Sequence, residues 1–132
     1  MKYKEFRMII FSIIMFVLIS GACIYFALDH NQSKVIIGLI LLFVLLSIIT
    51  TKYNMKIFND SMMIYEYKGI GILPALIDYK DVKDVKLISK HKIKIKHRSS
   101  TTIYILSAQE FYNELIERMD EYKNQIAKVN KQ

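Results

Sequence analysis

The chain has 132 residues, of which 53% are hydrophobic, and it carries a formal net charge of +7 and a single cysteine. A hydrophobic share this high is unusual for a soluble chain of this length, and one cysteine excludes an intramolecular disulfide framework. The apolar residues are concentrated near the N-terminus, which indicates two regions of unlike character.

Residues 1–7 form a short basic segment, and an uncharged run, Met8–Leu28, follows it. At about 1.5 Å per residue these 21 residues reach about 31 Å, the thickness of a hydrocarbon core. They therefore predict a spanning helix. The alternative is a cleaved signal peptide, with Ser20–Ala22 as small residues near the cleavage point. The length of the run, and a second apolar run only six residues later, favour the helix.

The second uncharged run, Val35–Thr51, has 17 residues and lies at the short end of the spanning range. The linker 29–34 is long enough only for a tight turn, so residues 8–51 are predicted to form a hairpin of two transmembrane helices. Lys and Arg are concentrated outside the hairpin loop, which predicts a multi-pass protein of the cell membrane with both termini in the cytoplasm. Neither run contains an ionisable side chain of the kind that marks an ion path. An anchor is predicted, with a sensing or pore-blocking hairpin as the alternative.

Residues 52–132 amount to one small cytoplasmic domain, in which the hydrophobic period shortens to that of β-strands. Turn residues separate the β-rich runs, and Pro74 predicts that the third strand is broken, bulged or at a sheet edge. Six strands are predicted, at about Met55–Phe58, Met62–Tyr67, Ile72–Tyr79, Val82–Ile88, Lys92–His97 and Thr101–Leu106.

Residues 108–129 are predicted to form an amphipathic helix, because apolar residues recur at steps of three and four. Ser107 and Glu110 provide an S-x-x-E capping box at its start. The apolar stripe is predicted to cover an open end or a face of the sheet. A coiled-coil seam is the alternative, so that a homo-oligomer is conceivable but not indicated. The stripe consists of Phe111, Leu115, Met119, Tyr122, Ile126 and Val129.

Two sets of charged residues are candidate contact sites. Residues 90–98 alternate cation and apolar residue with the strand period of two, which predicts one basic face for contact with anionic lipid. A solvated face whose lysines discourage edge pairing fits the pattern equally well. The acidic face of the C-terminal helix and three aspartates are better placed, in charge, to contact a cationic peptide. The basic set is Lys90, Lys92, Lys94, Lys96 and Arg98, and the aspartates are Asp78, Asp81 and Asp84.

Other function classes find little support in the sequence. The three histidines lack a metal-ligand spacing, and Gly69–Gly71 lacks the third glycine of a nucleotide fingerprint. From Lys52 onward, 15 Lys and Arg are offset by 10 Asp and Glu, and no nucleic-acid-binding motif is present. We therefore predict a protein that is not an enzyme, with no cofactor, no metal site and no nucleic-acid partner.

Four stretches resemble the bacterial pleckstrin-homology-like (PH-like) domain. Met62–Gly69 and then Ile77–Leu87 are similar to its strand, short excursion and "Y-K/D-D-I/V-x-x-I/V" step into the next strand. Ile103–Ser107 and then Glu110–Tyr112 are similar to its last strand leading into a helix. The resemblance covers roughly Tyr53 to Val129. It implies a small α+β domain, a PH-like β-barrel or meander closed by a C-terminal amphipathic helix.

Small proteins with two N-terminal transmembrane helices and such a domain include the immunity proteins of leaderless bacteriocins of the aureocin and lacticin type. The chain is similar to these in length, basic charge and layout. The resemblance implies non-catalytic self-protection of a bacterial membrane, with membrane lipids and a cationic bacteriocin peptide as partners. The alternative is a membrane-anchored PH-like scaffold or accessory subunit of an envelope or transport complex, with a membrane transporter as the partner.

Overall fold

The computed structural model describes residues 3–131, which form two compact units. The first unit, Arg7–Lys52, is called here the helical hairpin. The second, called the β unit, combines the N-terminal residues up to Phe6 with the chain from Tyr53 onward. The boundary after Lys52 lies one residue beyond the end of the predicted hairpin, residues 8–51. Residues 3–6 belong to the β unit, whereas the sequence pattern predicts a separate N-terminal segment at residues 1–7.

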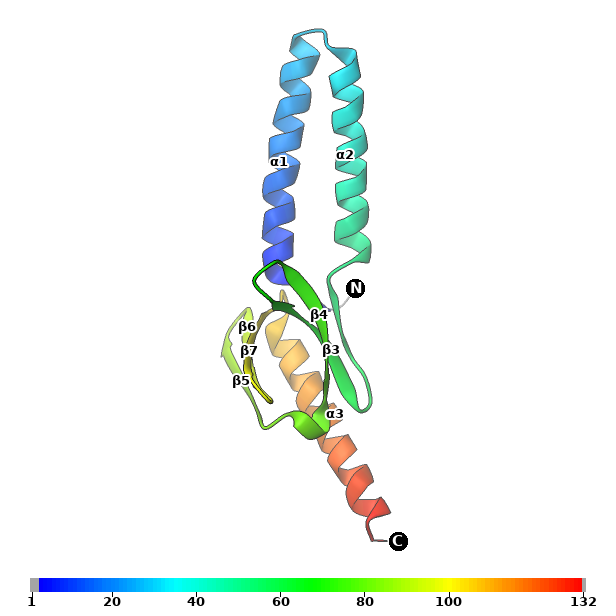
Figure 1. Cartoon of the computed structure of the whole chain (residues 1–132), viewed down its shortest axis with the longest axis vertical. Helices are drawn as coiled ribbons and strands as arrows, with labels where there is room; N and C mark the ends of the chain where they lie inside the picture. The colour runs from blue at the N-terminus through cyan, green and yellow to red at the C-terminus, as the bar shows by residue number, and fades with distance from the viewer. Residues whose placement is uncertain (1–2, 132) are drawn as a thin grey trace. The chain divides into compact units, whose positions relative to one another are not determined.

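The helical hairpin consists of two antiparallel helices, α1 (Phe6–Leu28) and α2 (Gln32–Thr51), which Figure 1 shows side by side. Both are long and apolar enough to cross a bilayer. The turn between them is shorter than the predicted linker, because α2 already begins at Gln32. Asn31 is its N-cap, and the Asn31 side-chain oxygen accepts a hydrogen bond from the Lys34 backbone N–H at 3.4 Å.

Apolar side chains cover the hairpin helices on all sides, and Ser12 is their one buried residue. The hydroxyl groups near the end of α2 are satisfied inside the helix itself. Thr51 donates to the Ser47 carbonyl oxygen at 2.7 Å, and Ser47 donates to the Phe43 carbonyl oxygen at 3.0 Å. Such bonds leave no hydroxyl hydrogen that requires water.

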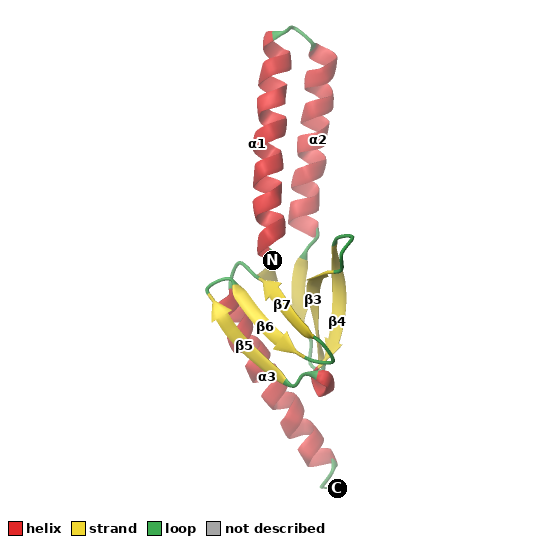
Figure 2. Ribbon diagram, turned by 60° about the vertical axis from the view of Figure 1, so that its left-hand side comes forward, coloured by secondary structure: helices red, strands yellow, loops and turns green. Residues whose placement is uncertain are grey.

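The β unit contains two antiparallel sheets and a C-terminal helix, as Figure 2 shows. Every strand predicted from the sequence is present, with ends that differ by up to two residues. The first sheet has the order β1 (Tyr3–Lys4), β2 (Asn54–Ile57), β3 (Ser61–Tyr67) and β4 (Ile72–Asp78). A short 3-10 helix, η1 (Tyr79–Asp81), leads to the second sheet, which has the order β5 (Asp84–Ser89), β6 (Lys92–Lys96) and β7 (Ser100–Tyr104).

Strand β1 is absent from the sequence prediction. It pairs with β2, so the helical hairpin is inserted between two neighbouring strands of one sheet. Tyr3 is buried and meets the Phe111 ring edge-on at 5.1 Å, while its hydroxyl donates to the Glu114 carboxylate. Glu5 pairs with Ile105 in an antiparallel bridge that joins the first sheet to the end of β7. Tyr3 and Glu5 are thus part of the buried core of the β unit.

Pro74 lies within β4, opposite Tyr65 of β3. Strand β4 is the last in its sheet, so the missing N–H of Pro74 costs no bond to a further strand. Of the three predicted alternatives, the edge position is the one observed.

Helix α3 (Ala108–Val129) covers the β unit with the first half of its apolar stripe. Ile126 and Val129 are exposed, because the last turns of the helix extend past the strands (Figure 1). Ser107 is the N-cap, but its side chain makes no capping hydrogen bond, so the predicted capping box does not form. The largest fully buried apolar side chains are Met62, Ile64, Ile93, Ile95, Ile103, Ile105, Phe111 and Leu115.

Candidate functional site

The outer side of the second sheet is basic. Ile93 and Ile95 of β6 are fully buried, and the lysines that alternate with them therefore point outward. Lys94 stands opposite Lys86 on β5, which adds a cation that the sequence analysis did not include. This basic face consists of Lys86, Lys92, Lys94 and Lys96.

The two ends of the predicted basic set lie outside the strand. Lys90 belongs to the turn between β5 and β6, and Arg98 belongs to the turn between β6 and β7. Lys92 and Lys96 are separated by four residues of extended chain, about 13 Å. Since the screening length at physiological salt is about 8 Å, Lys92 and Lys96 are largely screened from each other, while Lys94 lies between them.

Partners within the β unit modify the charge of this face. The Lys92 amine lies 5.6 Å from the centre of the Tyr104 ring, in cation–π range. Lys86 forms an ion pair with Asp84 at 3.5 Å. Arg98 lies 3.8 Å from Asp81, although the two are 17 positions apart in the chain.

The three aspartates considered for peptide contact are each paired with a cation. Asp81 and Asp84 pair as described, and Asp78 lies 3.4 Å from the Lys80 amine. These pairs are largely exposed, and pairs of this kind contribute little stability, about 0–1 kcal/mol. A cationic ligand would nevertheless have to displace an existing partner at each aspartate.

Helix α3 carries the more concentrated acidic surface. Four glutamates follow one side of the helix and line an open groove of about 600 Å³ together with Asn113 and Arg118. Arg118 pairs with Glu121 at 3.1 Å, which leaves the groove acidic on balance. The glutamates are Glu110, Glu114, Glu117 and Glu121.

A partly buried polar cluster connects the two sheets, and nothing in the sequence pattern pointed to it. The Thr101 hydroxyl donates to the Glu66 carboxylate at 2.9 Å and lies 2.9 Å from His97 Nε2. His97 Nε2 is also 3.6 Å from Glu66. His97 and Thr101 are four residues apart, whereas Glu66 lies on β3, so the approach of β3 to β7 completes the cluster. The cluster satisfies polar groups at a sheet junction and is no catalytic arrangement by itself.

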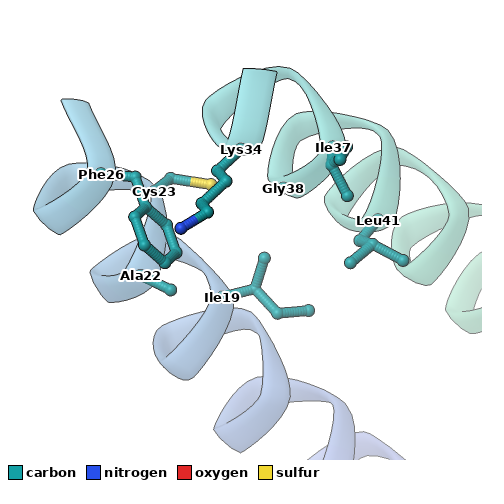
Figure 3. Close-up of a pocket in the computed structure, with 8 residues that line it drawn as sticks. All are labelled: Ile19, Ala22, Cys23, Phe26, Lys34, Ile37, Gly38 and Leu41. Carbon is teal, nitrogen blue, oxygen red and sulfur yellow. The ribbon is translucent and has the colours of Figure 1, made fainter. Parts of the chain in front are cut away.

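The hairpin has a small apolar pocket near its turn, with a volume of about 220 Å³ (Figure 3). At its edge the Lys34 amine extends from α2 to 4.7 Å from the centre of the Phe26 ring. Cys23 and Gly38 are in close contact, since a Cβ atom at position 38 would collide with the Cys23 sulfur. Gly38 therefore permits the close approach of α1 and α2, whereas the space around Gly21 is open. The remaining lining residues are Ile19, Ala22, Ile37 and Leu41.

Within residues 3–131, no three His, Cys, Asp or Glu side chains are grouped so that they could hold a metal ion. Burial is the main cause of the pKa shifts of Tyr79 and Lys4. Burial raises the pKa of Tyr79 to about 12, against an opposing effect of the Arg118 charge. Burial also lowers the pKa of Lys4. The Tyr79 hydroxyl donates to the Phe58 carbonyl oxygen at 2.6 Å, which is a structural role.

Comparison of the chain with protein families, with characterised proteins and with solved structures finds no match in any of the three.

Proposed function

We propose that the chain is an integral membrane protein whose helical hairpin spans the bilayer and whose β unit lies in the cytoplasm. The observation that carries this proposal is the surface of α1 and α2, on which large apolar side chains are exposed in every direction. Such a surface is unfavourable in water and favourable in hydrocarbon, at about 25 cal/mol per Å². The excess of Lys and Arg outside the hairpin turn supports cytoplasmic termini.

The β unit is proposed to be a PH-like domain. Its support is the arrangement of four and three antiparallel strands in two sheets with one amphipathic helix at the C-terminal end. The resemblance in Met62–Gly69, Ile77–Leu87 and Ile103–Tyr112 falls on these strands and on the start of α3. The hairpin lies between β1 and β2 in the chain, so two covalent connections would link the domain to a hairpin in the bilayer.

The proposed role is non-catalytic immunity, in which the protein protects the membrane of its producer against a cationic leaderless bacteriocin. The acidic groove on α3 supports this role, because its glutamates match the charge of such a peptide. The basic face of the second sheet would repel the same peptide. We therefore place peptide contact on α3 rather than at Asp78, Asp81 and Asp84.

The test is the growth of a sensitive bacterium, with and without the full chain, against a panel of purified leaderless cationic bacteriocins. Protection against one peptide is expected, and it should fall when Glu117→Lys and Glu121→Lys reverse the charge of the groove. The control for substitution on α3 is the charge swap Asp120→Lys with Lys123→Glu, which leaves the net charge unchanged at exposed positions outside the groove. No protection against any peptide would contradict the immunity role.

A second candidate is a scaffold or accessory subunit of an envelope or transport complex. The exposed apolar end of α3, with Ile126 and Val129, favours it, because a partner helix could cover these side chains. Copurification of the full chain with one membrane transporter, lost in Ile126→Ser with Val129→Ser, would support this role. Protection from a bacteriocin that is unchanged by the same two substitutions would favour immunity.

A further inference from the structure

The chain connects the β unit to the helical hairpin twice, after Phe6 and before Tyr53, and both connections leave the β unit at the same end. Phe6 is the last residue of the β unit before the hairpin, and its ring stacks on His91 at 4.4 Å. Tyr53 is the first residue after the hairpin, and its ring lies 5.3 Å from that of Tyr65. The β5–β6 turn, which contains His91, and the final part of β3 therefore mark this junction end.

The β3–β4 turn projects beyond Tyr65 at the junction end. Strand β3 starts at the β2–β3 turn and runs toward the junction end. The chain continues for three residues past Tyr65 and turns at Lys68, so the turn lies about 10 Å beyond Tyr65. The turn residue Ile70 is 92% exposed, the most exposed of the large hydrophobic side chains in the described structure.

The shape of this turn is well defined. The Lys68 backbone N–H donates to the Gly71 carbonyl oxygen at 3.0 Å, and the Tyr67 hydroxyl donates to the Gly69 carbonyl oxygen at 3.0 Å. Gly69 has a φ of +78°, which a side chain would disfavour. Ile70 is thus held outward by an ordered turn, without an intramolecular contact that would shield it from water.

Further apolar and basic side chains are exposed at the junction end. Leu106 is tied to it by the bond from its N–H to the Lys4 carbonyl oxygen, 3.1 Å, and its own carbonyl oxygen lies 3.0 Å from His91 Nδ1. Ile88 is in the last part of β5, just before the turn. The exposed side chains of this junction rim are Tyr67, Lys68, Ile70, Ile88, Lys90 and Leu106.

We propose that the junction rim lies in the headgroup region of the bilayer and that Ile70 inserts at its surface. This inference rests on the proposed membrane insertion of the hairpin. Two covalent connections then hold the junction end within a few residues of the bilayer, so the lipid surface is the nearest apolar phase for these side chains. A mixture of aliphatic, Tyr and Lys side chains is the composition expected at a membrane interface.

The basic residues of the β unit differ in their distance from the junction rim. Strand β6 begins at the junction end, beside the turn of Lys90, and runs away from it toward Lys96. Lys68 and Lys90 are therefore the cations near anionic headgroups, while Lys96 and Arg98 lie beyond the screening distance. The predicted lipid contact of the whole set 90–98 is thereby restricted to its first residues.

The experiment uses the absence of tryptophan from the chain. Single-tryptophan variants of the full chain are reconstituted in vesicles of phosphatidylcholine and phosphatidylglycerol with brominated acyl chains, which quench tryptophan in or near the hydrocarbon. The rim variants are Ile70→Trp and Ile88→Trp. The exposed control on the same β-hairpin is Leu76→Trp, and the control within α2 is Phe43→Trp.

We expect loss of fluorescence for both rim variants and for Phe43→Trp, with Leu76→Trp unquenched. Charge reversal by Lys68→Glu and Lys90→Glu should weaken the quenching of Ile70→Trp in anionic vesicles. Quenching of Phe43→Trp with both rim variants at the level of Leu76→Trp would overturn the rim while the hairpin remains inserted. An unquenched Phe43→Trp would instead overturn membrane insertion itself, and the rim with it.

Discussion

The two units use the same apolar residue types in opposite ways. Phe43 of the helical hairpin is 73% exposed, whereas Phe111 of the β unit is fully buried. In the hairpin the backbone hydrogen bonds of each helix run along that helix, and the apolar surface faces outward. In the β unit residues from the two chain termini meet in one core, as Tyr3 and Phe111 do. The stability of the hairpin therefore depends on the solvent around it, and the stability of the β unit depends on contacts between residues distant in the chain.

The sharpest test of this difference is Phe111→Ala compared with Phe43→Ala. We expect Phe111→Ala to lower the free energy of unfolding of the β unit by about 3–5 kcal/mol, since it opens a cavity in the core. Phe43→Ala should leave that free energy nearly unchanged. Guanidinium unfolding in mild detergent can be followed by the near-UV circular dichroism of tyrosine, because eight of the nine tyrosines lie in the β unit. Equal effects of the two substitutions would contradict the comparison.

A second test concerns the N-terminal residues. Tyr3→Ala removes a buried ring and its hydroxyl contact with Glu114, and we expect it to destabilise the β unit by about 3 kcal/mol. Tyr25→Ala, at an exposed position of α1, is the matched control. The same unfolding measurement applies. If Tyr3→Ala had no more effect than Tyr25→Ala, residues 3–6 would be a separate tail after all.

A third test concerns the packing of the hairpin. A Cβ atom at position 38 would lie 3.9 Å from the Cys23 Cβ, within the range of about 3.5–4.5 Å found in disulfides. Once the Cys23 sulfur rotates away from the position that the new Cβ would occupy, Gly38→Cys is expected to form a disulfide with Cys23 on mild oxidation. The 15-residue loop so closed would stabilise the hairpin by up to about 3 kcal/mol. Maleimide labelling of free thiols measures the result. Gly21→Cys, which points into open space, should remain reduced.

The smallest expected effect is on pH dependence. Tyr79 has a pKa of about 12 in the folded protein, compared with about 10 for an unperturbed tyrosine. Between these values the folded chain keeps a proton that the unfolded chain releases, so stability falls as the pH rises through this window. Tyr79→Phe should cost about 1 kcal/mol at neutral pH through the lost hydrogen bond to Phe58. Tyr79→Phe should also lessen the fall in the free energy of unfolding between pH 10 and 12. Unfolding curves at several pH values test this, and a difference between Tyr79→Phe and the unchanged chain that stays constant with pH would contradict it.

Periodicity along the sequence was sufficient to predict the helices and six of the strands. Ile93 and Ile95 alternate with lysines, and this alternation alone assigned them to the core face. The apolar stripe of α3 was predicted correctly, but the sequence did not show that only its first half is buried. The sequence period continues through Ile126 and Val129, whereas the strands that could cover them end earlier.

The candidate sites depended more strongly on tertiary structure. The basic face gained Lys86 because β5 pairs beside β6. Asp78 and Asp84 pair with lysines two residues away, and Asp81 pairs with the distant Arg98. The cluster of Glu66, His97 and Thr101 has no local signature. Sequence spacing cannot reveal such contacts, because they depend on the register between strands.

The sequence by itself determined that two apolar helices precede a small β-rich unit with a C-terminal helix, because those elements follow from local hydrophobic period and turn residues. Only the tertiary structure decided that residues 3–6 form the first strand of that unit, since a two-residue strand has no period to detect. Tertiary structure also decided that Arg98 pairs with Asp81, and that the turn with Ile70 lies at the junction end. The first depends on the approach of η1 to the β6–β7 turn, across 17 positions of the chain, and the second on the pairing of β1 with β2 across the inserted hairpin.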